Sequence, residues 1–570
     1  MTYQNLYEVR SIKDLKDMIN SSAALYGDKA AFLVKQKDNP EYAPISYKQF
    51  KNDIDALGTS LIKLGLKDKK IAIIGENRYE WCTAYLAVTG GTGIAVPLDK
   101  ELPANEIENL IKRSEADAVI YSGVLSESIG KIVRENIGPR YYINMDGETG
   151  EGSVLSYPKL ITSGRELLQN GERAFLDAVI NTEIMNILLF TSGTTDKSKA
   201  VMLSQKNICE NLMNMCSMLY IGDKDVFLSI LPLHHTYECT CGFLCQMYRG
   251  CTIAFCEGLR HIVKNLKESG CTVMNGVPLI FESIYKQILN QAAKKKGGLA
   301  ILKTAVSVSN FLGKIGIDLR RKLFKQVHEG LGGHIRLFIS GAAGIDPQVS
   351  KGFRNIGITL VQGYGLTECS PIVALNRDIR YKDDAAGLPL PNLEVEIAYA
   401  GQDGIGEIRC KGSSVMLGYY RNEEATNEVM KGGWFYTGDL GFIDSDGFVH
   451  ITGRKKNVIV TKNGKNIYPE EIETLLGRSP YVKESLVFGK DDEDGDIVVN
   501  AIIVPNYEKI EEDIKNDTAP GSNAYEILAR EVKSINKQLV PYKYIKHFDL
   551  RDEEFKKTTT KKIKRYQELN

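Results

Sequence analysis

Short apolar runs alternate with longer segments of helical periodicity through the first two thirds of the chain. The runs lie at 71–74, 117–121, 185–190, 226–230, 252–255, 272–274, 335–339 and 359–361, and many end at Gly, Ser or Pro. Segments between them, such as 77–89 and 207–219, can form helices. A strand–helix–strand order at this spacing predicts parallel sheets whose two faces are covered by helices.

The pattern changes twice towards the C-terminus. Short runs at 392–397, 406–410, 442–443 and 448–451 lie between Gly- and Asp-rich turns, which predicts a β-rich subdomain. After Arg454, helical segments at 470–476 and 526–539 and strands at 485–488 and 497–504 indicate a small α+β unit. We therefore predict an α/β protein. Its large N-terminal domain covers 1–454, with the β-rich subdomain at about 388–454, and a small mobile C-terminal domain covers 455–570.

Composition narrows the class of protein. With 43% hydrophobic and 25% charged residues, the chain of 570 residues is not a mainly disordered one. Lysine plus arginine and aspartate plus glutamate number 72 each, so no basic excess points to nucleic acid. The N-terminus has no apolar core of signal-peptide length, and the 11 cysteines lack zinc-ligand spacing. We expect free thiols and a cytoplasmic protein of unknown oligomeric state.

One local segment departs from this neutral balance. Residues 294–325 contain nine lysines and arginines and a single acid, Asp318, with apolar residues interleaved. Two interpretations stay open. These residues form helices that pack on the large domain with solvated lysines, or they form an amphipathic surface that contacts an anionic membrane peripherally.

A Ser/Thr-rich loop follows the apolar run that ends at Phe190. Its sequence, FTSGTTDKSKA, fills 190–200, where small hydroxyl residues around Gly193 would let backbone N–H groups and hydroxyls surround a polyphosphate. Lys197 and Lys199 can add positive charge. A plain surface turn is the alternative on composition alone. The loop is not a Walker loop, because GxxxxGK[ST] is absent.

Five further strings follow this loop in a fixed order. They are 231–235 (LPLHH), 363–368 (GYGLTE), 436–439 (YTGD), 453–454 (GR) with Gly464 and 469–473 (PEEIE), and 557–558 (KT) with 562–565 (KIKR). With these six motifs over 190–565 the chain resembles the adenylate-forming superfamily, which includes acyl-CoA synthetases, luciferases and peptide-synthetase adenylation domains. The strings LPLHHTYE, NGVPLIFESIY and FISGAAG are most similar to its long-chain fatty acyl-CoA synthetase branch.

The resemblance implies a reaction in two steps. A carboxylate attacks the α-phosphate of ATP to give an acyl-adenylate and pyrophosphate. The thiol of coenzyme A then attacks the adenylate to give a thioester and AMP. ATP and coenzyme A would be co-substrates, and Mg²⁺ would be the metal ion. Positioning and cations would supply most of the catalysis in the first step.

The resemblance also assigns a role to individual residues. As catalytic residues it implies Lys562, Glu368, His235 and Thr191. Lys562 would bridge the carboxylate and the phosphate, and Glu368 would bind Mg²⁺. The remaining positions are Thr191, Ser192, Gly193, Thr194, Thr195 and Lys199 for the phosphates, Ala342, Tyr364, Gly365 and Thr367 for the nucleotide, Asp439 and Arg454 for the ribose, Gly464 for the pantetheine arm and Lys456 for the hinge.

From the residues alone, plainer roles stay open at these positions. Lys562 can be a solvated lysine of a basic tail, and Glu368 can cap a helix. Asp439 can be a turn residue after glycine. The overall function has alternatives too: transfer of the acyl group to a separate carrier protein, or a catalytically weak homologue that binds nucleotide or lipid.

The phosphate loop departs from the family pattern at Asp196, Ser198 and Ala200, where the family prefers Gly, Pro and Gly. Asp196 puts a carboxylate beside a polyphosphate site, which should weaken ATP binding through like-charge repulsion. We expect Asp196→Gly to lower the KM for ATP in steady-state kinetics. An unchanged or higher KM would contradict this interpretation of Asp196.

Overall fold

The computed structural model describes residues 6–36, 39–134, 138–147, 153–191, 198–295, 297–461, 465–492, 497–558 and 562–569. Its contacts divide the chain into two compact units. The large unit comprises Met1–Glu394 and Cys410–Phe435, and the small unit comprises Val395–Arg409 and Tyr436–Asn570. The division passes through three strands, β17 (Leu393–Ala398), β18 (Gly406–Gly412) and β21 (Trp434–Ile443). The boundary that the sequence predicts near Lys456 stays a prediction.

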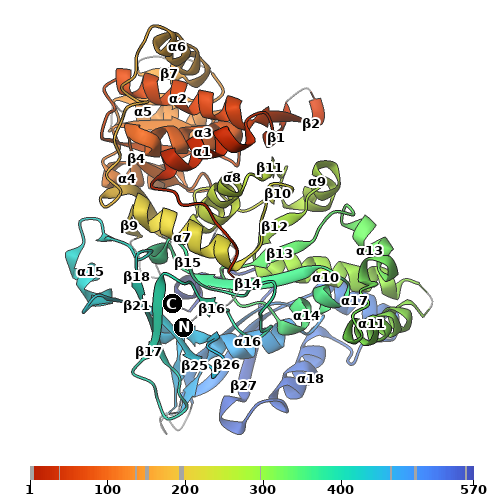
Figure 1. The fold of residues 1–570 in the computed structure, drawn as a ribbon. Helices are drawn as coiled ribbons and strands as arrows, with labels where there is room; N and C mark the ends of the chain where they lie inside the picture. Colours follow the sequence, from red (N-terminus) through yellow and green to blue (C-terminus); the bar gives the residue numbers. More distant parts are fainter. Residues whose placement is uncertain are drawn as a thin grey trace. The chain divides into compact units, whose positions relative to one another are not determined.

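The large unit contains an eight-stranded sheet (Figure 1). In spatial order its strands are β19 (Gly418–Tyr419), β9 (Lys199–Ser204), β8 (Met185–Thr191), β4 (Gly93–Leu98), β3 (Lys69–Ile74), β5 (Ala118–Tyr121), β6 (Tyr141–Asn144) and β7 (Val154–Ser156). The strands from β8 to β7 run parallel, whereas β9 pairs antiparallel with both β8 and β19. The β8–β9 hairpin therefore carries the phosphate-loop sequence at the point where the parallel order ends.

A nine-stranded sheet forms the rest of the large unit's framework. Its order is β16 (Leu388–Pro389), β15 (Ile372–Leu375), β14 (Thr359–Gly365), β13 (Leu337–Ser340), β12 (Val273–Gly276), β10 (Val226–Ser229), β11 (Thr252–Phe255), β1 (Ala30–Gln36) and β2 (Asn39–Ser46). From β14 to β1 the pairing is parallel, and β2, β15 and β16 are antiparallel.

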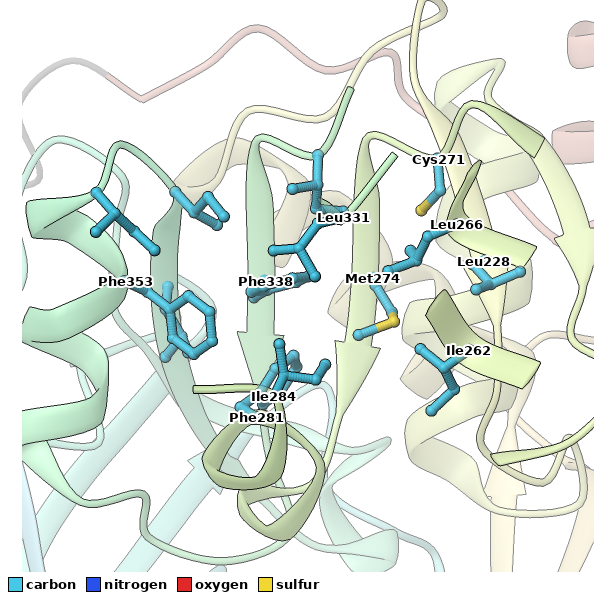
Figure 2. Packing of buried hydrophobic residues seen from close by; sticks show 14 of the residues in the cluster. Leu228, Ile262, Leu266, Cys271, Met274, Phe281, Ile284, Leu331, Phe338 and Phe353 are labelled. Carbon is cyan, nitrogen blue, oxygen red and sulfur yellow. The ribbon is translucent and has the colours of Figure 1, made fainter. Parts of the chain in front are cut away.

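Helices cover these sheets and bury their apolar residues. They are α1 (Leu15–Tyr26), α2 (Tyr47–Lys63), α3 (Tyr79–Ala87), α4 (Ala104–Ser114), α5 (Ser126–Arg134), α6 (Tyr157–Gln169), α7 (Gln205–Met218), α8 (Cys245–Arg249), α9 (Ile262–Ser269), α10 (Pro278–Ala293), α11 (Gly298–Lys314), α12 (Arg320–Leu323), α13 (Lys325–Gly330), α14 (Pro347–Asn355) and α15 (Glu423–Val429). Figure 2 shows one core cluster, where Phe281 of α10 and Phe353 of α14 pack on Phe338 of β13. Burial of such side chains is the main stabilising term of the fold.

The small unit is built differently. The strands β21 and β22 (Val449–Arg454) form a hairpin, and β25 (Val482–Asp491), β26 (Ile497–Pro505) and β27 (Ile545–Leu550) form a three-stranded sheet. Its other elements are β23 (Ile459–Val460), β24 (Asn466–Ile467), α16 (Pro469–Gly477), α17 (Tyr507–Lys515), α18 (Ala524–Asn536) and α19 (Arg565–Glu568). Residues of α16 and α18 share one apolar cluster with this sheet.

The predicted fold class is confirmed: parallel α/β layers in a large part and a smaller α+β part. One strand is longer than the sequence pattern predicts. The run at 442–443 is only the end of the ten-residue β21, so Asp439 lies on a strand and not in a turn. Gly438 adopts a positive φ of 72° inside this strand, which interrupts the alternation that the pattern analysis relies on.

All 11 cysteines lie among the described residues, none of them forms a disulfide bond, and every one except the half-buried Cys256 is buried. Burial raises the pKa of the Cys239 thiol to about 12. Among the residues that the structure describes, no helix combines the length and the apolar character needed to cross a bilayer.

Candidate active site

The β8–β9 hairpin holds the two ends of the phosphate-loop sequence together. Thr191 and Lys199 are direct partners in the strand register, and the Thr191 hydroxyl donates to the Lys199 carbonyl oxygen at 3.3 Å. Ser192, Gly193, Thr194, Thr195 and Asp196 lie outside the described residues. The two positions that the structure describes are therefore adjacent and half-buried.

Glu368 lies close to the β8–β9 hairpin, although it is 169 residues from Lys199 in sequence. The link is Tyr419 of β19, whose strand pairs with β9. The Tyr419 hydroxyl donates to Glu368 Oε1 at 2.9 Å, and the Lys199 ammonium lies 4.7 Å from the centre of the Tyr419 ring. One tyrosine thus positions a carboxylate and an ammonium beside the phosphate-loop hairpin. None of the six motifs contains Tyr419, and its only signal in the sequence is the string GYY at 418–420.

An arginine supports the other end of the loop. Arg113, in the last turn of α4, donates to the Ser198 hydroxyl at 2.9 Å and to its carbonyl oxygen at 2.6 Å. The guanidinium also lies 5.3 Å from the centre of the Phe190 ring, on the opposite strand. Ser198 stands where the resembled family prefers proline, and Arg113 fixes the backbone there by hydrogen bonds.

We expect Tyr419→Phe to raise the Mg²⁺ concentration needed for half-maximal ATP–pyrophosphate exchange about tenfold. The substitution keeps the ring beside Lys199 and removes only a hydrogen bond to a charged group. The control is Tyr420→Phe, whose hydroxyl contacts Glu115 and Lys70 instead. A lower Tm with no change in the Mg²⁺ requirement would show that Tyr419 acts only on stability.

The predicted nucleotide residues lie at the C-terminal end of β14 or in the segments that follow β13 and β14. Tyr364 and Gly365 are the last residues of β14, and Thr367 begins a short 3₁₀ helix that contains Glu368. At Gly365 a Cβ atom would lie 2.1 Å from the carbonyl oxygen of Pro371, so only glycine fits where the chain doubles back. Ala342, in the loop after β13, has a φ of +70°, a strained conformation for alanine. Tyr364 is buried.

A buried polar network holds the segment that carries His234 and His235. Asn77 donates to the Leu231 carbonyl oxygen at 2.6 Å and accepts from the Leu233 N–H at 3.0 Å. It also donates to Ser229, whose hydroxyl donates to Glu238 Oε1 at 2.6 Å. This network fixes the backbone on both sides of Pro232 and so positions the histidines that follow.

His234 and His235 are neighbours in space as well as in sequence. Their rings lie 4.4 Å apart. Burial and the charge of Lys100 lower the pKa of His234 to about 3, so it is neutral at pH 7 and its 3.6 Å contact with Asp99 is not an ion pair. His235 is half-buried at the start of the π-helical segment 237–244. Its role as a catalytic residue, which the resemblance implies, stays a prediction.

Glu238 has an unusual protonation state for a carboxyl group. It is fully buried, and burial raises its pKa to about 8, against the Ser229 hydrogen bond, which lowers it. Its Oε2 has no hydrogen-bond partner among the described residues. Below pH 4.5 the carboxyl is protonated in both the folded and the unfolded chain. Between pH 4.5 and 8 only the unfolded chain ionises, so stability falls as pH rises, by up to about 1.4 kcal/mol per pH unit.

We therefore expect Glu238→Gln to flatten the pH dependence of stability. The amide matches the shape of the neutral acid and cannot ionise, so the Tm difference between variant and wild type should be more positive at pH 8 than at pH 5. Calorimetry at the two pH values measures it. The same Tm difference between variant and wild type at both pH values would mean that Glu238 is not protonated in the folded protein.

The small unit contains a second group of predicted residues. Asp439 of β21 and Arg454 of β22 are direct partners across the hairpin, and Arg454 Nε lies 2.7 Å from Asp439 Oδ1. Asp439 is buried, whereas the Arg454 side chain is 44% exposed. Next to them, Lys455 Nζ lies 2.8 Å from Glu407 Oε2. The hairpin thus presents an ordered carboxylate–guanidinium pair.

Lys562 is held in the C-terminal tail by local pairing and a docking contact. Its N–H donates to the Thr558 hydroxyl at 3.2 Å, and the next residue, Ile563, packs against a small apolar cluster that includes Phe555. Arg565 fixes the tail by donating to the Val487 carbonyl oxygen at 2.7 Å. These contacts set the register of the segment that bears Lys562.

Two lysines of the small unit have pKa values near neutrality. Desolvation, with the positive charge of Arg454 added, lowers the pKa of Lys562 to about 8, and Asp439 opposes the shift. Desolvation, Arg454 and Arg565 lower the pKa of Lys456 to about 8. Both residues are exposed at the surface of the small unit, and both are still mainly protonated at pH 7. A lysine with a perturbed pKa is a candidate functional group. Gly464 lies outside the described residues.

Comparison with known proteins decides the family. The model of the AMP-binding enzyme family matches residues 19–420, and that of the AMP-binding enzyme C-terminal domain matches residues 456–569. The chain belongs to the AMP-binding enzyme family. This confirms the resemblance to the adenylate-forming superfamily that the six motifs indicate.

The curated relatives extend the likeness to nearly the whole chain. Long-chain-fatty-acid–CoA ligase 5 of Rattus norvegicus is 30% identical over 522 residues, which are 85% of this chain and 74% of that protein. Long-chain-fatty-acid–CoA ligase FadD15 of Mycobacterium bovis is 29% identical over 482 residues, 80% and 78% of the two chains. Long-chain-fatty-acid–[acyl-carrier-protein] ligase AEE15 of Arabidopsis thaliana is 26% identical over 574 residues, 87% and 77%.

Solved structures of this family share the fold. The anthranilate CoA ligase AuaEII in complex with anthranoyl-AMP has a TM-score of 0.76 at 18% identity, covering 100% of this chain and 97% of that one. The ATP-bound RpMatB-BxBclM chimera B1 has a TM-score of 0.72 at 25% identity, covering 96% and 97%. The likeness to long-chain acyl-CoA ligases confirms the branch that the sequence indicates.

Proposed function

We propose that this protein is an acid–thiol ligase that activates a long-chain fatty acid. In the first step the carboxylate attacks the α-phosphate of ATP, and pyrophosphate leaves as the acyl-adenylate forms. In the second step the thiolate of coenzyme A attacks the acyl carbon, and AMP leaves as the thioester forms. The observation that carries the proposal is the grouping of Thr191, Lys199 and Glu368 through Tyr419. The relatives named above support the choice of acid and thiol.

The residues of the large unit suit a magnesium–nucleotide complex. Mg²⁺ usually keeps several waters and binds through one or two carboxylates together with substrate phosphates. Glu368 supplies one half-buried carboxylate, oriented on Oε1 by Tyr419 and next to the phosphate-loop strand. Bound there, Mg²⁺ would neutralise phosphate charge. We propose Glu368 as its ligand, with Thr191 and Lys199 contacting the phosphates.

The residues of the small unit suit the sugar and the reacting groups. The Asp439 carboxylate, held by Arg454, would accept hydrogen bonds from ribose hydroxyls. Lys562, protonated at pH 7, would donate to the carboxylate and the α-phosphate oxygen as charge develops on phosphorus. We propose Lys456 as the hinge between the half-reactions and Gly464 as the point where the pantetheine arm passes, on the strength of the family motifs.

The test is acid-dependent ATP–pyrophosphate exchange over a series of acids from C2 to C18. The proposal expects exchange to rise with chain length and to be greatest for long-chain acids. Exchange that peaks with acetate or with an aromatic acid would overturn the substrate class. Absence of exchange with every acid would favour a nucleotide- or lipid-binding homologue without activity.

An acyl carrier protein is the alternative to coenzyme A as the acceptor of the acyl group. The Arabidopsis relative AEE15 is named for an acyl carrier protein, and it is similar to 87% of this chain. Thioester formation with free coenzyme A and with a pantetheine-bearing carrier protein, measured side by side, separates the two. We expect free coenzyme A to be used. Exchange that leads to a thioester only on the carrier protein would assign the alternative.

A further inference from the structure

Helix α11 has two apolar faces, and one of them is covered. Leu302, Ala305 and Val306 pack against the core cluster shown in Figure 2. The helix also packs along α10 and α14 (Figure 1). These contacts confirm that the basic segment forms helices packed on the large unit, as one of the two sequence interpretations requires.

The second apolar face is open to solvent. Ile301, Val308 and Ile315 follow one another at intervals of seven residues, with Phe311 between them, and are 67%, 47%, 60% and 65% exposed. Seven residues are nearly two helical turns, so Ile301, Val308 and Phe311 lie on one side of α11, and Ile315, the C-cap residue, continues their line. Single exposed apolar residues are ordinary, but an aligned set of four large ones indicates a binding surface.

The charges around this face are mainly positive. Lys303 and Lys314 are exposed and lie three turns apart on one flank of α11, about a third of a turn around the helix axis from the apolar residues. Neither forms an ion pair with any described residue. Further exposed lysines around the helix are Lys294, Lys295 and Lys322, together with Lys325, which lies 3.6 Å from Glu329. The acid of this segment, Asp318, is already paired with Arg320 at 2.6 Å. The surface therefore combines an apolar stripe with an excess of positive charge.

We propose that the exposed face of α11 and its lysines bind the surface of an anionic lipid bilayer. The apolar side chains would enter the boundary between headgroups and acyl chains, and the lysines would contact the phosphates. Long-chain acids partition into bilayers, so this surface would keep the enzyme where its substrate is. That consequence rests on the proposed function, whereas binding to vesicles does not.

A second copy of the chain is a poorer occupant of the same face. In a two-fold symmetric contact each face meets its own equivalent. Lys303 and Lys314 of one copy would then lie close to those of the other, and like charges at an interface oppose association. An anionic bilayer complements both the apolar stripe and the charge.

The test is flotation of the full-length protein with vesicles of phosphatidylcholine alone or with 30% phosphatidylglycerol. We expect binding only to the anionic vesicles, with at least fivefold less protein bound at 500 mM than at 50 mM NaCl, because salt screens the lysines. Ile301→Ser/Phe311→Ser and Lys303→Glu/Lys314→Glu should each reduce binding at least fivefold. The control, Val179→Ser/Ile379→Ser, changes exposed apolar residues elsewhere in the large unit and should bind like wild type.

Three results would overturn the proposal. They are no binding of the wild type at low salt, binding of both α11 variants equal to that of the wild type, and a dimer in light scattering that Ile301→Ser/Phe311→Ser dissociates. Exchange activity with a detergent-dispersed acid should be the same in all these variants. Flotation without exchange would refute the proposed function and leave the surface standing. Exchange without flotation would refute the membrane-binding surface and leave the proposed function standing.

Discussion

Lys562→Ala should lower ATP–pyrophosphate exchange at least about 100-fold and leave the second half-reaction nearly intact. A single donor aimed at charge that develops in the transition state commonly contributes two to three orders of magnitude. Lys562 is exposed, and its pKa of about 8 keeps it mainly charged at pH 7, as such a donor must be. The second step, started from synthetic acyl-adenylate and coenzyme A, should change less than threefold.

Lys564→Ala is the matched control in the same tail. It removes an equal charge two residues away and should leave both half-reactions within about twofold of wild type. An equal loss of both half-reactions in Lys562→Ala would point to a damaged tail, and no loss in either would show that another group stabilises the phosphate charge.

Glu368→Gln should lower exchange about 100-fold at low millimolar Mg²⁺. The amide can still accept the Tyr419 hydrogen bond, so the local fold should persist while the negative charge needed for the cation is lost. Raising the Mg²⁺ concentration should restore part of the activity. Glu424→Gln, an exposed acid in the first turn of α15, is the control and should behave like wild type. Lost activity with an unchanged Mg²⁺ dependence would remove Glu368 as the ligand.

Local patterns predict the parts of the site that one hairpin brings together. Thr191 and Lys199 are eight positions apart, and the apolar runs that flank them predict their strands. Asp439 could be singled out by its motif, but its place on a strand could not, because Gly438 breaks the alternation. The pairing of Asp439 with Arg454 then follows from a hairpin register that the single sequence does not fix.

Contacts between segments that are distant in sequence cannot be predicted from the local sequence pattern. Tyr419 reaches Glu368 only because the two-residue strand β19 pairs with β9, and nothing local predicts so short a strand. The Asn77–Ser229–Glu238 network likewise joins residues from three elements. In α11 the sequence is apolar on two sides, so periodicity alone could not say that Ile301 is exposed while Val306 is covered.

The central claim is that the protein joins a long-chain acid to coenzyme A at the expense of ATP. The most direct measurement is the product balance with palmitate, ATP, Mg²⁺ and coenzyme A, by chromatography of nucleotides and thioesters in one reaction. We expect AMP and acyl-CoA in a one-to-one ratio, with no ADP formed and no AMP without the acid. Formation of ADP, or of AMP without a matching thioester, would contradict it.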